Sequence, residues 1–188
     1  MRRRIERFSP ARLLRDKRGG ILVEFAMAMP VLLILLIGGV ELGRYVLLNQ
    51  KLDRTVMTIS DIVASSTTVT TAEIDQIFDA TGLILEPFPF GAEGTVVISS
   101  VRRQTGSPKV IWQRSGAGSL SVTSLVGVQG GNATLSDNDL VDNSQAIIIG
   151  EVFYQYTPWF TDLIPSSIIR HQSAFRPRQS NEVVCSDC

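Results

Sequence analysis

The sequence has few of the residues that most catalytic sites require. Among 188 residues there is one histidine, His171, and no serine lies within a GxSxG motif. A nucleophilic hydrolase needs a serine or cysteine beside a general base, and His171 falls in a segment expected to be a loop. The Lys-Ser/Thr ending of a phosphate-binding loop is also absent. The sequence therefore predicts no catalytic residue, no cofactor and no enzymatic activity.

Metal ligands are equally scarce. The two cysteines, Cys185 and Cys188, form the terminal CSDC motif, and a metal site would need two further ligands. In an oxidising compartment the same spacing permits a local disulfide, so the simplest interpretation is a dispensable end with or without a disulfide loop. Asp137, Asp139 and Asp142 lack the glycine and the terminal glutamate of an EF-hand, which favours a solvated acidic turn. No metal site is predicted.

The chain also lacks net charge, but its charges are unevenly distributed. Residues 1–18 contain eight basic and two acidic residues, a net charge of +6, and the rest contains ten basic and sixteen acidic residues, a net charge of −6. A basic segment can bind nucleic acid. Here it leads directly into an apolar stretch, where basic residues keep their side of a membrane protein in the cytoplasm. We therefore expect no nucleic-acid partner.

The apolar stretch covers residues 21–40 and contains one charged residue. A bilayer core of about 30 Å requires roughly 20 apolar residues in a helix, which this stretch supplies. A cleaved secretory signal has a shorter apolar core, of about 7–15 residues, followed by a small-residue cleavage site. The stretch is therefore expected to stay in the protein as a membrane-spanning anchor in contact with lipid.

The helical pattern continues beyond the membrane segment. Apolar residues recur at spacings of three and four, which predicts one helix over residues 21–64, about 65 Å long at about 1.5 Å per residue. This stripe has two interpretations: it packs on the chain's own outer domain, or it meets a helix of a partner. The stripe consists of Leu42, Tyr45, Asn49, Leu52, Val56, Ile59 and Val63.

A second, shorter helix is expected over residues 72–80. It follows the polar tract at residues 65–71, and Thr70 stands three residues before Glu73, the spacing of a capping box. Residues 81–82, a threonine and a glycine, are expected to end it.

The remaining pattern is typical of strands. Residues 95–102 and 110–113 flank a turn at residues 105–108 and predict a hairpin, and residues 146–156 are the strongest strand. Residues 114–144 have the composition of loops. Together these elements predict an α+β fold: a long N-terminal transmembrane helix, then a small domain with a short helix and an antiparallel sheet of three or four strands.

The junction before the membrane segment has an unusual combination of residues. A charge such as Glu24 within a membrane helix costs about 2.5–3.5 kcal/mol on insertion scales and needs a partner or a function. Snorkelling toward the cytoplasmic surface is one way to lower this cost. A cut between Gly19 and Gly20 offers another, because Glu24 then becomes the fifth residue and can neutralise the new α-amine.

At these residues the chain resembles a known family. RGGILVEFAMAMP, residues 18–30, is similar to the leader junction of type IV prepilins, and Glu24, Phe25 and Pro30 resemble the TadE/TadF-like minor pseudopilins of tight-adherence (Tad/Flp) pili. In that family prepilin peptidase cuts after the glycine that matches Gly19. The resemblance continues with GVELGR, GEVFYQYTPWF and FRPR, at residues 39–44, 150–160 and 175–178.

The resemblance implies a minor pseudopilin that assists pilus assembly, and with it adhesion and surface attachment. It implies a basic leader at residues 1–19, the long helix at residues 20–64 and a periplasmic domain at residues 65–188. The expected location is the inner membrane, crossed once, with the N-terminus in the cytoplasm. The implied partners are prepilin peptidase, other minor pseudopilins, the major pilin and the inner-membrane assembly platform. The alternative is a periplasmic binding or sensor domain whose anchor is never cut.

Further expectations concern the anchor and the aromatic residues. Pro30 lacks an amide hydrogen and should kink the helix. Gly39 and Gly43 form a GxxxG motif, a candidate contact between membrane helices. Glu41 and Arg44 are expected to form a pair that faces water at the outer interface. The larger aromatic residues of the outer domain are interpreted as core or interface residues: Trp112, Phe153, Tyr154 and Trp159.

Overall fold

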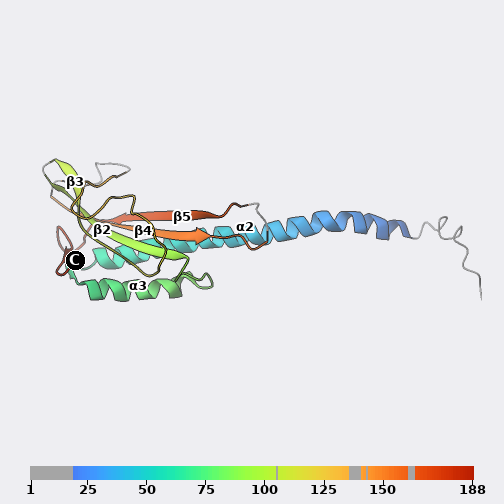
Figure 1. Ribbon diagram of the computed structural model, residues 1–188, viewed down its shortest axis with the longest axis horizontal. Coiled ribbons are helices and arrows are strands. Elements are labelled where there is room, and N and C mark those ends of the chain that lie inside the picture. Colours follow the sequence, from blue (N-terminus) through green and yellow to red (C-terminus); the bar gives the residue numbers. More distant parts are fainter. Residues whose placement is uncertain (1–18, 105, 136–140, 143, 161–163) are drawn as a thin grey trace, which may run out of the picture.

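One long helix, α2, determines the shape of the molecule, because it extends well beyond the domain packed around its second half (Figure 1). α2 (Gly20–Ala64) is continuous, as the apolar pattern predicts, and is about 67 Å long at about 1.5 Å per residue. The computed structural model describes residues 19–104, 106–135, 141–142, 144–160 and 164–188. The expected leader therefore falls, except for Gly19, outside the described residues.

α2 ends where serine and threonine replace the apolar pattern. The Ser65 amide donates to the Asp61 carbonyl at 2.9 Å, and the Ser65 hydroxyl donates to the Ile62 carbonyl at 2.7 Å. Serine competes with the backbone in this way, which favours the end of a helix. The chain then forms β1 (Thr68–Val69), which pairs in parallel with β6 (Val184–Cys185). The expected linker is thus joined to the last strand of the chain.

The second helix, α3 (Thr71–Leu85), begins at the predicted capping box and ends later than predicted. The Thr70 hydroxyl accepts from the Glu73 amide at 3.2 Å, and the Thr70 amide donates to the Glu73 carboxylate at 2.8 Å. The expected end at residues 81–82 is wrong because Thr81 and Leu85 are fully buried and hold a further turn against the core. The helix stops before Pro87, which disfavours the helical conformation in the residue before it.

The outer domain contains a four-stranded antiparallel sheet in the order β3-β2-β4-β5, so the predicted α+β fold is confirmed. The hairpin of β2 and β3 and the long buried strand β4 are the segments that the sequence predicts. Residue 105, within the expected turn, lies outside the described residues. The strands are β2 (Gly94–Gln104), β3 (Ser107–Gly116), β4 (Ile147–Tyr156) and β5 (Ser167–Phe175).

The edge strand β5 corrects the expectation that His171 lies in a loop. His171 is in the middle of β5, opposite Val152 of β4, and its Nε2 lies 3.1 Å from the Asn49 Oδ1 of α2. Two residues later, the Ser173 hydroxyl donates to the Val56 carbonyl at 3.0 Å. Because β5 meets the helix through polar side chains, it lacks the alternating apolar pattern that identifies a half-buried strand.

The core lies between the second half of α2, α3 and the sheet, and α2 contacts β4 and β5 directly (Figure 1). The predicted stripe is partly right: Leu52, Val56, Ile59 and Val63 are buried, whereas Leu42 is 54% exposed. The buried part of the stripe therefore packs on the chain's own domain and not on a partner. Close packing depends on Gly150 of β4, where a Cβ atom would lie 2.0 Å from the Ser60 hydroxyl oxygen.

Candidate functional site: the protruding helix and its boundary with the domain

The first half of α2 lies outside the domain. Every residue from Gly19 to Ile37 is exposed, and Glu41 is the first buried residue of the helix. Residues 20–40 measure about 31 Å along the axis at about 1.5 Å per residue, close to the thickness of a hydrocarbon core. By length and composition α2 can cross a membrane. The only free apolar surface of this extent among the described residues is therefore shaped like a membrane span.

The glycine pair stands where this helix begins. Gly19 is the N-cap and has φ −83° and ψ −6°, a conformation that any residue adopts. Among the residues that the structure describes, a Cβ atom at Gly19 or Gly20 would meet no atom within 4 Å. Neither backbone conformation nor packing therefore requires glycine at Gly19, and packing does not require it at Gly20.

Glu24 and Phe25 lie on the exposed surface of the same segment. Glu24 is one helical turn after Gly20, so the two residues share a face of α2. No hydrogen bond or ion pair joins Glu24 to another residue in the part of the chain that the structure describes. Phe25 is 53% exposed. Both side chains are thus available to groups outside the domain.

The other three expected residues of the anchor also lie on α2. The helix continues through Pro30, so the proline does not end it, and the expected kink stays a prediction. Gly39 and Gly43 lie one turn apart, and a Cβ atom at either would meet no atom within 4 Å. The domain therefore leaves the GxxxG face open to a neighbouring helix.

The boundary between the protruding and packed halves is a buried carboxylate. Glu41 and Arg44 form the expected pair, with Arg44 Nη1 at 3.4 Å from Glu41 Oε1, but the expectation that it faces water is wrong. Glu41 is fully buried because the chain after β4 folds over it. The Tyr156 hydroxyl donates to Oε1 of Glu41, and the Trp159 amide donates to Oε2 at 3.2 Å.

These contacts shift the pKa values of both acids. Burial by itself raises the pKa of Glu41, but the hydrogen bonds from Tyr156 and Trp159 and the charge of Arg44 outweigh it, so the pKa is lowered. Burial and the bond to Glu41 raise the pKa of Tyr156 to about 12. The carboxylate therefore stays ionised and the phenol stays protonated around neutral pH, which is the pairing that the hydrogen bond needs.

Aromatic side chains surround Arg44. Its guanidinium carbon lies 4.1 Å from the ring centre of Trp159 and 5.5 Å from that of Tyr156, and Nη1 donates to the Thr157 carbonyl at 3.2 Å. Trp159 and Phe160 are nevertheless 67% and 64% exposed. Trp112, Phe153 and Tyr154 are buried as expected, so Trp159 is the exception.

The fold brings three separate segments that carried the family resemblance together along α2. The segments at residues 39–44 and 150–160, which carried the resemblance separately, contact each other here. The third segment, at residues 175–178, also reaches α2, since the Arg178 amide donates to the Ala64 carbonyl at 3.1 Å and its side chain pairs with Asp61. The motifs of the outer domain thus meet the helix that carries the first motif.

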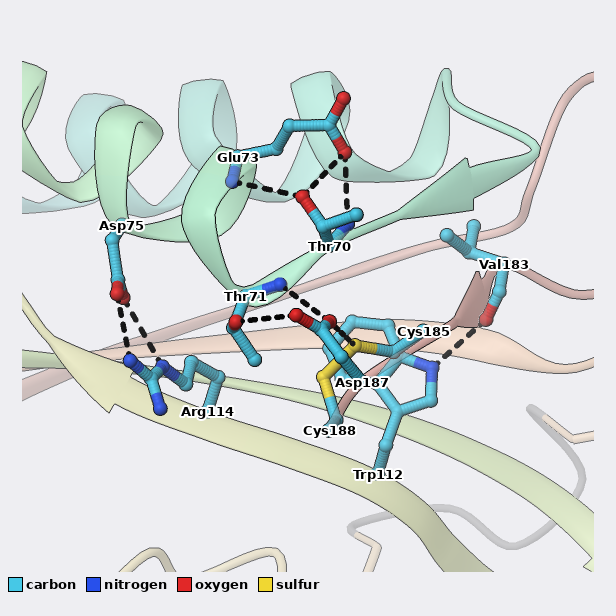
Figure 2. The surroundings of a disulfide bond; sticks show 10 residues. All are labelled: Thr70, Thr71, Glu73, Asp75, Trp112, Arg114, Val183, Cys185, Asp187 and Cys188. Carbon is cyan, nitrogen blue, oxygen red and sulfur yellow. Dashed lines mark hydrogen bonds and ion pairs between the residues drawn. A yellow bond between two sulfur atoms is a disulfide. The ribbon is translucent and has the colours of Figure 1, made fainter.

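The last residues of the chain are packed against α3 and do not form a loose end (Figure 2). Cys185 and Cys188 are joined by a disulfide. Asp187 accepts from the amide and the hydroxyl of Thr71, both at 2.7 Å, and these two bonds lower the pKa of Asp187. The Trp112 indole donates to the Val183 carbonyl at 2.8 Å. The expectation of a dispensable end does not take this packing into account.

The described residues give little support to a metal or catalytic site. Cys185, Asp187 and Cys188 are close together, but the two sulfurs are bonded to each other and do not offer the thiolate that binds metal. Of the three aspartates that were considered for calcium, Asp137 and Asp139 lie outside the described residues and Asp142 is exposed.

The comparisons agree with the resemblance at the helix. The model of the family described as TadE-like protein matches residues 19–59, which begin at the glycine pair and extend along most of α2. No curated protein and no solved structure matches the chain. The segment that is similar to the TadE-like family therefore runs from the glycine pair to the part of α2 that packs on the sheet, the same segment in which the resemblance began.

Proposed function

We propose that this chain is a minor pseudopilin of a Tad-type pilus system, cut by prepilin peptidase between Gly19 and Gly20 and assisting pilus assembly. One observation carries the proposal: an exposed apolar helix of membrane-spanning length begins at a glycine pair and lies within the TadE-like match. Residues 20–40 of α2 do not take part in the core of the outer domain. Its surface is therefore available to lipid before assembly and to other subunits during it.

Cleavage after Gly19 would explain why this position is a glycine, which the fold does not explain. Packing and backbone conformation would tolerate a side chain at Gly19, so the need for glycine comes from another molecule. A peptidase that must place its catalytic groups against the peptide bond has that need, because glycine lets another backbone approach closely. The cut would also remove the basic leader, once its positive charge has kept the N-terminus in the cytoplasm.

Glu24 can neutralise the positive charge that the cut would create. The new α-amine at Gly20 would be a cation at the edge of an apolar segment, and a carboxylate one helical turn away can neutralise it on the same chain. In an assembled fibre the same carboxylate can reach the amine of a neighbouring subunit. Glu24 is exposed, so both arrangements are open to it.

The helix would also supply the contacts for assembly. Its partners would be other minor pseudopilins, the major pilin and the inner-membrane assembly platform, met through the apolar surface of residues 20–40. Gly39 and Gly43 would allow one such helix to approach closely. The disulfide at Cys185 supports a periplasmic position for the outer domain, because disulfides persist in oxidising compartments. Adhesion and surface attachment would then be properties of the assembled pilus.

The mature N-terminus tests the proposal. The full chain is co-expressed with prepilin peptidase, and mass spectrometry of the N-terminal peptide is expected to find a chain that starts at Gly20. Gly19→Ala should block the cut, whereas the matched variant Gly20→Ala should still be cut and start at Ala. An intact Met1 with active peptidase would favour the uncut, permanently anchored domain instead. Cleavage blocked only by Gly20→Ala would move the site by one residue.

A further inference from the structure

The outer end of the membrane-spanning segment can be located on α2. Residues 20–40 are apolar except for Glu24, are exposed except for the half-buried Gly38, and are about 31 Å long at about 1.5 Å per residue, which matches one hydrocarbon core. Glu41 follows immediately and is fully buried in the outer domain. The domain therefore begins where the lipid ends, with no spacer between the two.

One loop of the domain is fixed at this level. The Trp159 amide donates to Glu41 at 3.2 Å, and the Trp159 ring lies 4.1 Å from the Arg44 guanidinium carbon. Both partners belong to the first helical turn after the apolar segment. Residues 157–160, which follow β4, are therefore held within one turn of the membrane surface, even though they lie more than 110 residues from Glu41 and Arg44 in the sequence.

The aromatic side chains of this loop point away from the domain's core. Trp159 and Phe160 are 67% and 64% exposed, and their rings contact each other edge to face with centres 6.2 Å apart. The Trp159 amide and the Thr157 carbonyl are directed inward, to Glu41 and Arg44 respectively, whereas the two aromatic rings remain exposed. Tryptophan is enriched where membrane meets water because its ring is apolar with one polar group.

We propose that Trp159 and Phe160 form a second membrane contact beside α2, with their side chains in the headgroup and acyl boundary of the outer leaflet. This contact sets the depth and tilt of the outer domain on the lipid surface. It depends on α2 spanning the membrane and not on cleavage, so it holds equally for an uncut anchor. The occupant is lipid because the pair continues the surface of the membrane segment itself.

Fluorescence quenching tests the proposal on the full chain. The protein is reconstituted in vesicles of phosphatidylcholine and phosphatidylglycerol that carry nitroxide-labelled lipids, with the label near the headgroup or deep in the acyl chain. The chain has two tryptophans, Trp112 and Trp159, and Trp112 is 4% exposed beneath Val183. The difference between the unmodified chain and the Trp159→Phe variant isolates the emission of Trp159. This surface substitution leaves the buried Trp112 as an internal control.

The shallow nitroxide is expected to quench Trp159 several times more strongly than the deep one, with aqueous iodide nearly without effect. Trp112 should be quenched by neither lipid. Quenching of Trp159 by iodide and not by lipid would overturn the proposal, because the ring would then lie in water. Protection from both quenchers would overturn it too, and would indicate that protein covers the pair.

A matched pair of exposed apolar residues controls for surface hydrophobicity. Leu125 and Val128 are 59% and 60% exposed and precede Gly130, whose amide donates to Val110 at the end of the sheet away from Tyr156. Leu125→Trp in the Trp159→Phe background should be quenched by iodide and not by lipid. Equal lipid quenching at both positions would overturn the proposal, because vesicles would then bind any exposed apolar side chain.

Discussion

Glu41 lies between the exposed apolar segment of α2 and the packed domain. It is the residue next to the membrane-spanning segment, where a charge would ordinarily face water, and yet it is fully buried. A buried carboxylate is tolerated when hydrogen bonds replace its water. Tyr156 of β4 and the Trp159 amide after it provide two of them, and Arg44 of α2 itself provides the third.

Removing the Tyr156 hydroxyl should therefore destabilise the domain. Tyr156→Phe leaves a buried carboxylate without its nearest donor, and a hydrogen bond to a charged group contributes about 1.5–3 kcal/mol. The free energy of unfolding, measured by urea denaturation in detergent micelles, should fall by about 2 kcal/mol. Tyr154→Phe on the same strand is the control, because its hydroxyl has no hydrogen bond to a described residue. Equal losses in the two variants would contradict the prediction.

The same variant should show a defined pH dependence. The pKa of Tyr156 rises from 10.0 to about 12 in the folded protein, so its stabilisation is complete below pH 10 and is lost as the pH rises through about 12. The pKa of Glu41 is lowered from 4.5, so its stabilisation is present above that value and is lost as the pH falls below it. The difference between the unmodified chain and Tyr156→Phe should thus be largest between these limits.

At the scale of elements, the packing of α2 on β4 depends on small residues at the contact. Gly150 leaves room for Ser60, whose hydroxyl is hydrogen-bonded to the Ser173 hydroxyl of β5 at 2.8 Å. A small residue on the strand and two short polar side chains bring three elements together. Helix, central strand and edge strand are therefore coupled at one position.

Gly150→Ala is expected to push α2 away from β4 and to destabilise the domain. The added Cβ would lie 2.0 Å from the Ser60 hydroxyl oxygen and 3.1 Å from Val56 Cγ2, and overpacking of this kind costs about 1–3 kcal/mol. Ser60→Ala in the same chain should recover part of the loss, since the Ser60 Cβ is 3.4 Å away. Gly82→Ala in α3 meets no atom within 4 Å and should be neutral or stabilising. A larger loss for Gly82→Ala in urea denaturation would contradict this account.

The elements that the sequence predicted are those whose signal is local. α2, the cap of α3, the hairpin and β4 each follow from apolar spacing or from a capping pair within a few residues. β5 was not predicted because the pattern of an edge strand that bonds to a helix is polar. The extra turn of α3 was missed because Leu85 is fixed by the core and not by its neighbours in sequence.

The candidate site divides in the same way. Gly19, Glu24 and Pro30 could be proposed from the sequence because the argument for them depends on their spacing along one segment, and their roles stay predictions. The burial of Glu41 and the position of Trp159 could not, because each depends on a contact between residues more than 110 positions apart. Short motifs can be read from neighbouring residues, whereas the boundary of the domain depends on contacts that form only in the folded chain.

At the scale of the whole molecule, the protruding helix and the packed domain are expected to have separable roles. Glu24→Ala should leave membrane insertion, cleavage and the outer domain unchanged, because the side chain contacts none of the described residues of that domain. Pilus assembly should be strongly reduced, because the α-amine at Gly20 loses its counter-charge. The measurements are the amount of mature protein in the membrane fraction and the number of surface fibres in electron micrographs.

Glu24→Asp serves as the matched variant, because it keeps the charge on a shorter side chain. It should retain part of the assembly that Glu24→Ala loses. Full assembly by Glu24→Ala would refute the neutralisation argument, and loss of membrane protein in either variant would assign Glu24 to insertion.

The pairing of β1 with β6 imposes an order on the events after synthesis. Residues 68–69, which follow α2, pair with a strand only at residues 184–185, and the Thr71 amide in the first turn of α3 donates to Asp187. With the proposed topology, these contacts cannot form until residues 184–187 have crossed the membrane. A partly exported chain would then lack this closure, so it would differ in conformation from a fully exported one before any assembly begins.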